Sequence, residues 1–275
     1  MSQGQQRKTT VVAMVAVAAV LMTAAVTGWL VLGRDGGKDG VDGAKKDEAN
    51  VSPSGPPSPS SSSSSSSGAE GAPQPVIAGW KTVVNPKTGI VFDVPGEWDR
   101  KETSWVSYVA ENSDDAEEEK ILVGFSAPGA LKEKWCRSDE DKDGTAEDTA
   151  LAEAGSRTEN SSKSVADAAR KNAELWVYGA YAQPDRTKIS NGPVESYTTA
   201  SGVTGSLATS ESSGVEQPGK CDTDGKATAF AFENSKGDYV SWTFRGAKGV
   251  ADEVPDATVR KILSTVRLTD GTTGA

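Results

Sequence analysis

The chain has 275 residues, of which 39 are acidic, 29 are basic and none is histidine, and its formal net charge at pH 7 is −10. An acidic balance of this size argues against nucleic acid as a partner. Without histidine, the Ser-His-Asp, Cys-His and HExxH arrangements are excluded, and no GxSxG, GxGxxG, GxxxxGK[ST] or CxxC motif occurs. We therefore expect no enzyme and no cofactor.

Residues 9–33 form an uncharged apolar run. As a helix the run would be about 37 Å long, enough to cross a hydrocarbon core of about 30 Å. We predict a transmembrane signal-anchor that contacts the lipid bilayer; a cleaved signal peptide is the alternative. Over 200 residues follow the run, and long domains translocate largely regardless of charge. The prediction is a single-pass cell-membrane protein, with residues 1–8 cytoplasmic and the C-terminal domain extracytoplasmic.

Residues 34–75 are rich in Gly, Asp, Lys, Ser and Pro and have almost no large apolar side chains. Such a composition predicts a disordered linker. Ser60–Ser67 is an unbroken serine run, which is either an unmodified spacer or a site of O-glycosylation. We also expect a disordered tail over residues 270–275.

Cys136 and Cys221 are the only cysteines, and both follow the predicted span. An even pair in an oxidising compartment predicts a disulfide. Two separate thiols are the alternative.

An acidic stretch shortly after Cys136 begins like an EF-hand loop. Asp139, Asp141 and Asp143 alternate before Gly144, as calcium ligands do at the start of such a loop. Position twelve, where a bidentate Glu is needed, is Ala150, and no helix is predicted to enter the loop. The stretch is therefore either a calcium loop or a solvated acidic loop.

The predicted folded domain covers residues 76–269 and begins with two pairs of strands. Gly79–Val84 and Ile90–Val94 flank a Pro- and Gly-containing turn, which predicts a hairpin. Trp105–Val109 and Ile121–Phe125 form the second pair, separated by an acidic loop.

The clearest helix is predicted over Val165–Tyr181, with Ser164 as its N-cap and an acidic residue three positions later. An extended stretch is predicted over Val194–Ser210. Ala227–Phe232 and Tyr239–Phe244 alternate in polarity, which predicts half-buried antiparallel strands.

The chain then closes with a helix after Pro255 and a short strand, Thr265–Leu268. Strands and helices are segregated along the sequence. The predicted class is α+β, an antiparallel sheet with helices packed on its faces.

Tryptophan positions separate expected core residues from candidate contact residues. We expect Trp80, Trp98, Trp176 and Trp242 to face the core. Trp105 and Trp135 are less clearly internal, and an exposed tryptophan of this kind can stack on a sugar ring or a partner.

The segment from Trp80 to Trp98, with Pro86, Gly89 and Phe92-Asp93-Val94-Pro95-Gly96-Glu97-Trp98, resembles the start of PsbP-like domains, including the LpqN-type lipoproteins of actinobacteria. The layout of span, Ser/Pro stalk and two cysteines is similar to an uncharacterised family of actinobacterial membrane-anchored proteins. The resemblance implies a PsbP-like fold and an accessory or binding role.

Three functions remain open at this point. The leading hypothesis is a non-enzymatic binding or accessory domain displayed at the cell surface, with an unidentified extracytoplasmic ligand or protein as its partner. A structural protein of the cell envelope is the alternative. A carboxylate-dependent hydrolase is the second alternative, and it would need two convergent carboxylates in one cleft.

Overall fold

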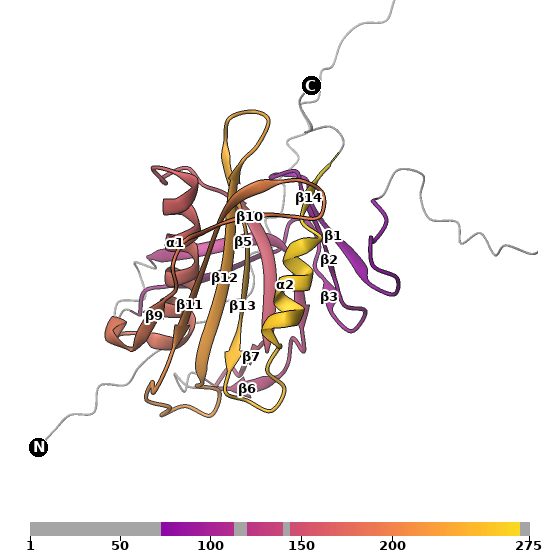
Figure 1. Ribbon diagram of the computed structural model, residues 1–275. Helices are drawn as coiled ribbons and strands as arrows, with labels where there is room; N and C mark the ends of the chain where they lie inside the picture. The colour runs from indigo at the N-terminus through magenta and orange to yellow at the C-terminus, as the bar shows by residue number, and fades with distance from the viewer. Residues whose placement is uncertain (1–72, 113–119, 140–143, 270–275) are drawn as a thin grey trace, which may run out of the picture. The chain divides into compact units, whose positions relative to one another are not determined.

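The computed structural model describes residues 73–112, 120–139 and 144–269 (Figure 1). The predicted cytoplasmic residues 1–8, the span 9–33, nearly all of the linker and the tail lie outside these ranges. Within the described ranges, no helix is both long enough and apolar enough to cross a membrane.

A nine-stranded antiparallel sheet forms the centre of the domain (Figure 1). Its order is β10 (Glu195–Thr198), β11 (Thr204–Ser212), β12 (Asp224–Glu233), β13 (Tyr239–Lys248), β8 (Ala152–Thr158), β5 (Ile121–Leu131) and β3 (Asp99–Arg100), with β4 (Val106–Ala110) also paired to β5 and β9 (Ile189–Asn191) to β11.

Different elements cover the two faces of this main sheet. Helix α1 (Val165–Val177) and the π-helix η1 (Tyr178–Ala182) pack on one face, and a 3-10 turn, η2 (Arg186–Lys188), follows them. The other face packs against α2 (Asp256–Ser264) and a three-stranded antiparallel sheet of β1 (Lys81–Asn85), β2 (Ile90–Val94) and β14 (Arg267–Leu268). A two-stranded hairpin, β6 (Cys136–Ser138) and β7 (Glu147–Thr149), completes the domain.

The predicted α+β class is wrong. The described residues contain fourteen strands and only two α-helices, so the domain is predominantly antiparallel β-sheet. Several strands cannot be predicted from their composition, because they are rich in Ala, Gly, Ser and charged residues and poor in the β-branched and aromatic residues that favour strands. The central strand β8, with the sequence AEAGSRT, is the clearest case.

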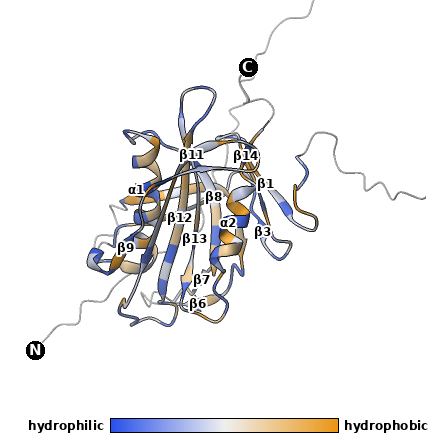
Figure 2. Ribbon diagram, in the orientation of Figure 1, coloured by the Kyte–Doolittle hydropathy of each residue, from blue (hydrophilic) through white to orange (hydrophobic). Residues whose placement is uncertain are grey.

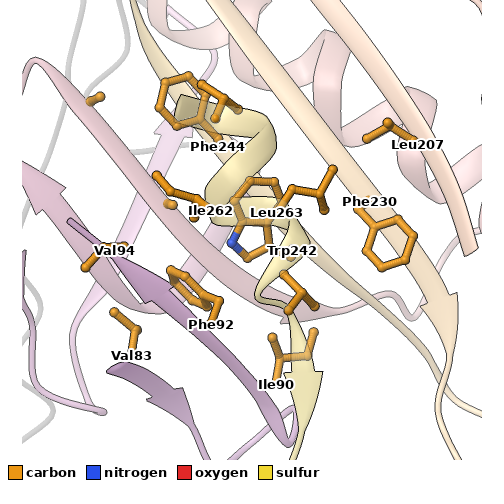
Figure 3. Packing of buried hydrophobic residues seen from close by; sticks show 14 of the residues in the cluster. Val83, Ile90, Phe92, Val94, Leu207, Phe230, Trp242, Phe244, Ile262 and Leu263 are labelled. Carbon is orange, nitrogen blue, oxygen red and sulfur yellow. The ribbon is translucent and has the colours of Figure 1, made fainter. Parts of the chain in front are cut away.

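The larger core lies between the main sheet and the layer of α2 and the small sheet (Figure 3). Phe92 from β2 meets Trp242 from β13 edge to face, with ring centres 6.1 Å apart. Aromatic pairs in this arrangement add to the free energy gained from burial. Helix α2 carries hydrophobic and hydrophilic residues on different sides (Figure 2), and its buried residues are Val259, Ile262 and Leu263.

The core under α1 is built from smaller side chains. Three alanines of the helix pack against three of the sheet: Ala168, Ala169, Ala173, Ala208, Ala229 and Ala231. Further along the helix, Trp176 stacks on Phe125 with ring centres 4.4 Å apart. Because small residues let the backbones approach closely, α1 lies tight on the sheet.

Several predicted elements are confirmed. β1 and β2 pair across the predicted turn, and β4 pairs with β5. The side chain of Ser164 accepts a hydrogen bond from the N–H of Asp167, so the predicted N-cap is present. Helix α2 and strand β14 close the domain as expected.

Two predicted elements differ from the structure. The extended stretch Val194–Ser210 is a hairpin of β10 and β11, with a turn stabilised by a bond from the N–H of Thr199 to the carbonyl of Val203. Strand β13 is buried on both faces instead of one, because α1 covers the face opposite Trp242.

Candidate functional site

The main sheet has two ends, and α2 (Asp256–Ser264) points from the first end toward the second. At the first end, the amino group of Lys226 binds the carboxylate of Asp256, the first residue of α2, over 2.6 Å. At the second end, the N–H of Ala200 donates to the carbonyl of Ser264, the last residue of α2, over 3.0 Å. We therefore call the end of the main sheet near Lys226 the first end and the end near Ala200 the second end.

Two long loops leave the sheet at its first end (Figure 1). Residues 132–151 connect β5 to β8, where Leu131 pairs with Ala152, and residues 213–223 connect β11 to β12. We call these two segments the linked loops. They are joined by a disulfide between Cys136 and Cys221, with Cα atoms 5.6 Å apart, so the predicted disulfide is confirmed.

The predicted calcium residues fall on the β6–β7 turn of the linked loops. Asp139 is exposed, and its carboxylate accepts a hydrogen bond from the N–H of Gly144 over 3.2 Å. Asp141 and Asp143 lie outside the described residues. Strands flank the turn, whereas helices flank an EF-hand loop. No group of three or more His, Cys, Asp or Glu residues in the described ranges is arranged to hold a metal ion, and calcium binding stays a prediction.

At the second end, a buried carboxylate joins the start of the domain to its last strand. Asp93 is fully buried and accepts from the N–H of Val76 over 2.7 Å and from Arg267 over 3.0 Å. Arg267 also donates to the carbonyl of Gln74 over 3.0 Å, and the hydroxyl of Thr265 accepts from the N–H of Asp93 over 2.8 Å. We call this group the terminal clamp.

A second buried ion pair lies beneath α1. Glu153 from β8 and Arg245 from β13 face each other in register, and a guanidinium nitrogen lies 2.5 Å from a carboxylate oxygen. The hydroxyl of Ser107 donates to the other carboxylate oxygen over 2.9 Å. Trp176 lies above Arg245, whose guanidinium carbon is 5.2 Å from the ring centre. Because both charges are buried, removing either side chain would leave the other as an unpaired charge inside the protein, which is strongly destabilising.

The π-helix at the end of α1 brings Tyr181 to this pair. After Trp176, an α-helix would return to the same face four residues later, whereas a π-turn returns after about five. The Tyr181 ring packs so closely on β12 that a Cβ at Gly225 would lie 2.0 Å from it. Burial raises the pKa of the Tyr181 hydroxyl, and the positive charge of Arg245 opposes that effect.

The pKa of Arg245 is raised overall. Burial by itself would lower it, but the carboxylate of Glu153 and the oxygen of Tyr181 outweigh burial. The guanidinium is therefore held as a cation inside the domain. No sequence signal connects Glu153 to Arg245, because 92 residues separate them and neither belongs to a motif.

Two carboxylates, those of Glu253 and Asp256, lie close together, as the hydrolase alternative would require, but both bind the same lysine. Glu253 and Asp256 each lie 2.6 Å from the amino group of Lys226. Burial raises the pKa of Glu253, but hydrogen bonds from Lys226 and from the N–H of Gly249 outweigh it, so the pKa is lowered overall. A glycosidase acid needs a raised pKa. This pair instead binds β12 to the start of α2.

The tryptophans divide much as expected. Trp98, Trp176 and Trp242 are fully buried, whereas Trp80 is only partly buried against the larger core. Trp105 and Trp135 are also partly buried. The amino group of Lys101 lies 4.5 Å from the Trp105 ring centre, so a cation already occupies one face of that ring.

Comparison with known proteins gives a family and no activity. No curated protein sequence matches the chain. Residues 73–271 match the family described as "Domain of unknown function (DUF8017)", a range that contains the linked loops, the terminal clamp and the Glu153–Arg245 pair. The chain therefore belongs to this family of domains of unknown function.

Proposed function

We propose that the protein is anchored in the cell membrane by residues 9–33 and that its domain binds a ligand or protein partner outside the cell, without catalysing a reaction. The apolar run in the sequence is the basis for the anchor. The domain geometry is the basis for the binding surface.

One observation carries the proposal: the terminal clamp and the linked loops lie at opposite ends of the domain. The clamp holds Gln74 and Val76, where the chain arrives from the proposed anchor. The linked loops begin at the other end of α2 and are cross-linked by Cys136 and Cys221. Loops on a rigid scaffold often carry binding residues. The entering segment, Gln74 to Val76, is held at the clamp, so it leaves the linked loops at the opposite end of the domain uncovered.

The disulfide supports an extracytoplasmic location, because structural disulfides persist in oxidising compartments and are rare in the cytosol. It uses both cysteines of the chain. The likeness of residues 80–98 to PsbP-like domains, which we infer to reflect a common origin, supports a binding or accessory role over a catalytic one.

Site-specific photo-crosslinking in living cells tests the binding surface. A photoreactive amino acid at Gln217, exposed in the linked loops, is compared with one at Lys236, exposed in the β12–β13 turn at the other end. We expect a discrete adduct from position 217 and none from 236. Equal adducts from both positions, or adducts from 236 alone, would contradict the proposal.

Protease treatment of intact cells tests the topology. We expect added protease to remove the domain while a cytoplasmic marker protein stays intact. A domain that is cleaved only after lysis would contradict the extracytoplasmic location.

A further inference from the structure

The linked loops contribute almost nothing to the core of the domain. Apart from Leu151, where the first loop ends, every residue at the described positions 132–139, 144–150 and 213–223 is exposed or only partly buried. The buried members of the apolar clusters in the described residues all come from other parts of the chain. Burial of apolar surface is the main favourable contribution to folding, so the linked loops receive little of their stability from it.

Each of the linked loops has its own internal structure. β6 and β7 pair with each other and form a sheet that is separate from the main sheet. In the second loop, the N–H groups of Gly214 and Val215 donate to the carboxylate of Asp224 over 3.1 and 3.2 Å. The first loop leads into β8 and the second into β12, and β13 lies between these two strands. The loops therefore meet across the end of β13 and are not parts of one hairpin.

The contact between the two loops is centred on the disulfide. The amino group of Lys220 also donates to the carbonyl of Arg137, but over 3.4 Å and at the surface, where water competes for the same groups. Cys136 and Cys221 are both partly exposed. Exposed disulfides are reduced more readily than buried structural ones.

We propose that the disulfide between Cys136 and Cys221 is a redox switch for the linked loops. In the oxidised protein the bond holds the two loops together as one binding surface. In the reduced protein the loops separate, the main sheet stays folded, and the partner is released. The inference rests on the proposed function, because the surface that the bond controls is the one proposed to bind the partner.

The switch is opened by a dithiol reductant. One thiolate of the dithiol attacks a sulfur of the Cys136–Cys221 bond and forms a mixed disulfide, and the second thiolate then displaces the remaining cysteine. The protein gains two electrons and two protons and carries two thiols, and the dithiol becomes a disulfide. The reverse exchange with an oxidised dithiol closes the bond again.

Limited digestion with trypsin tests the change in the loops. Arg137 and Lys220 are exposed trypsin sites next to the two cysteines, and Lys236, exposed in the β12–β13 turn, is the matched control. The full chain in detergent micelles is reduced, alkylated with iodoacetamide and freed of reductant before trypsin is added. We expect cleavage after Arg137 and Lys220 to appear only in the reduced protein, with cleavage after Lys236 unchanged.

Two results of this digestion would overturn the proposal. Equal cleavage after Arg137 and Lys220 before and after reduction shows that other contacts fix the loops. An equal acceleration after Lys236 shows that reduction opens the whole domain, because proteolysis follows the population of the opened state. The variant Cys136→Ser with Cys221→Ser must give the same pattern as the reduced protein, which excludes an effect of the alkyl groups.

Photo-crosslinking from Gln217 in living cells tests the control of binding. The adduct of the wild type is compared with that of the Cys136→Ser, Cys221→Ser variant, each relative to the amount of folded protein at the cell surface. We expect the adduct to be lost in the variant. An adduct that persists in the variant overturns the redox switch and leaves the proposed function standing. Absence of the adduct in the wild type contradicts the proposed function itself, and the digestion then decides whether the disulfide controls the loops.

Discussion

Asp93 and Arg267 form an ion pair of 3.0 Å across 174 residues of sequence, and the carboxylate has no exposed surface. The pair joins β2 to β14, and through Gln74 and Val76 it also binds the first residues of the domain. One carboxylate therefore connects three separate segments.

Removing this carboxylate should strongly destabilise the domain. Asp93→Ala leaves Arg267 and the N–H of Val76 without their partner, and breaking a buried pair in this way typically costs about 3 to 5 kcal/mol. We expect a loss of that size in the free energy of unfolding, measured by urea denaturation of the full chain. Arg260→Ala is the control, because its 3.9 Å pair with Glu195 is exposed and should contribute less than about 1 kcal/mol.

Removing one member of the Glu153–Arg245 pair should strongly lower the free energy of unfolding, whereas replacing both members with apolar residues should change it little. We expect Glu153→Gln to lower the free energy of unfolding by about 3 to 5 kcal/mol, because Arg245 keeps its charge in a buried site. Changing both residues, Glu153→Leu with Arg245→Met, removes both charges and should be close to neutral. Denaturation of the single and double variants gives the coupling energy. A double variant as unstable as the sum of the singles would disprove this account.

The disulfide should stabilise the domain by an amount that grows with the logarithm of the length of the loop that it closes. Its cysteines are 85 residues apart, which corresponds to about 4 to 5 kcal/mol on chain-entropy grounds. We expect Cys136→Ser with Cys221→Ser to lower the midpoint of urea unfolding. Reduction of the wild-type protein should have the same effect, and agreement between the two serves as the control.

The close contact between Tyr181 and Gly225 leaves no room for a side chain. We expect Gly225→Ala to lower the free energy of unfolding by about 1 to 3 kcal/mol, because the new methyl group overlaps the Tyr181 ring. In a Tyr181→Ala background the same substitution should cost much less. An unchanged cost in that background would show that the strain lies in the backbone of β12.

Glu253 should make stability depend on pH in the acid range. Its pKa in the folded state is below the ordinary value of 4.5, although burial acts in the opposite direction, because Lys226 and Gly249 hydrogen-bond to the carboxylate. Stability from this group is present above pH 4.5 and is lost as the pH falls through the lowered pKa. Glu253→Gln should flatten the acid side of a melting-temperature profile. An unchanged slope would assign the acid dependence to other carboxylates.

The sequence predicted those elements that carry a local signal, such as a helix N-cap or an alternation of apolar and polar residues. Ser164 and Asp167 marked the start of α1, and alternating aromatic residues marked β12 and β13. Strand β8 was missed because its residues are small or charged, and it becomes a strand through pairing with β5 and β13 on either side. Tertiary context overrode propensity there.

The candidate site was predictable only where it depends on residue type alone. The chain has only two cysteines, so each could form an intramolecular disulfide only with the other, and the sequence predicted the bond. Nothing in the sequence links Asp93 to Arg267 or Glu153 to Arg245, because each pair is brought together by strands distant in sequence. The inward turn of Tyr181 depends on a π-helix that the helical pattern of α1 does not indicate.

The bond from Arg267 to the carbonyl of Gln74 has a practical consequence for labelling the molecule. It puts the beginning and the end of the domain side by side, so a fluorescent protein or epitope fused after residue 269 would sit near the arriving chain, away from Cys136 and Cys221. A C-terminal reporter should therefore leave the linked loops accessible, whereas an insertion in the β6–β7 turn would cover them.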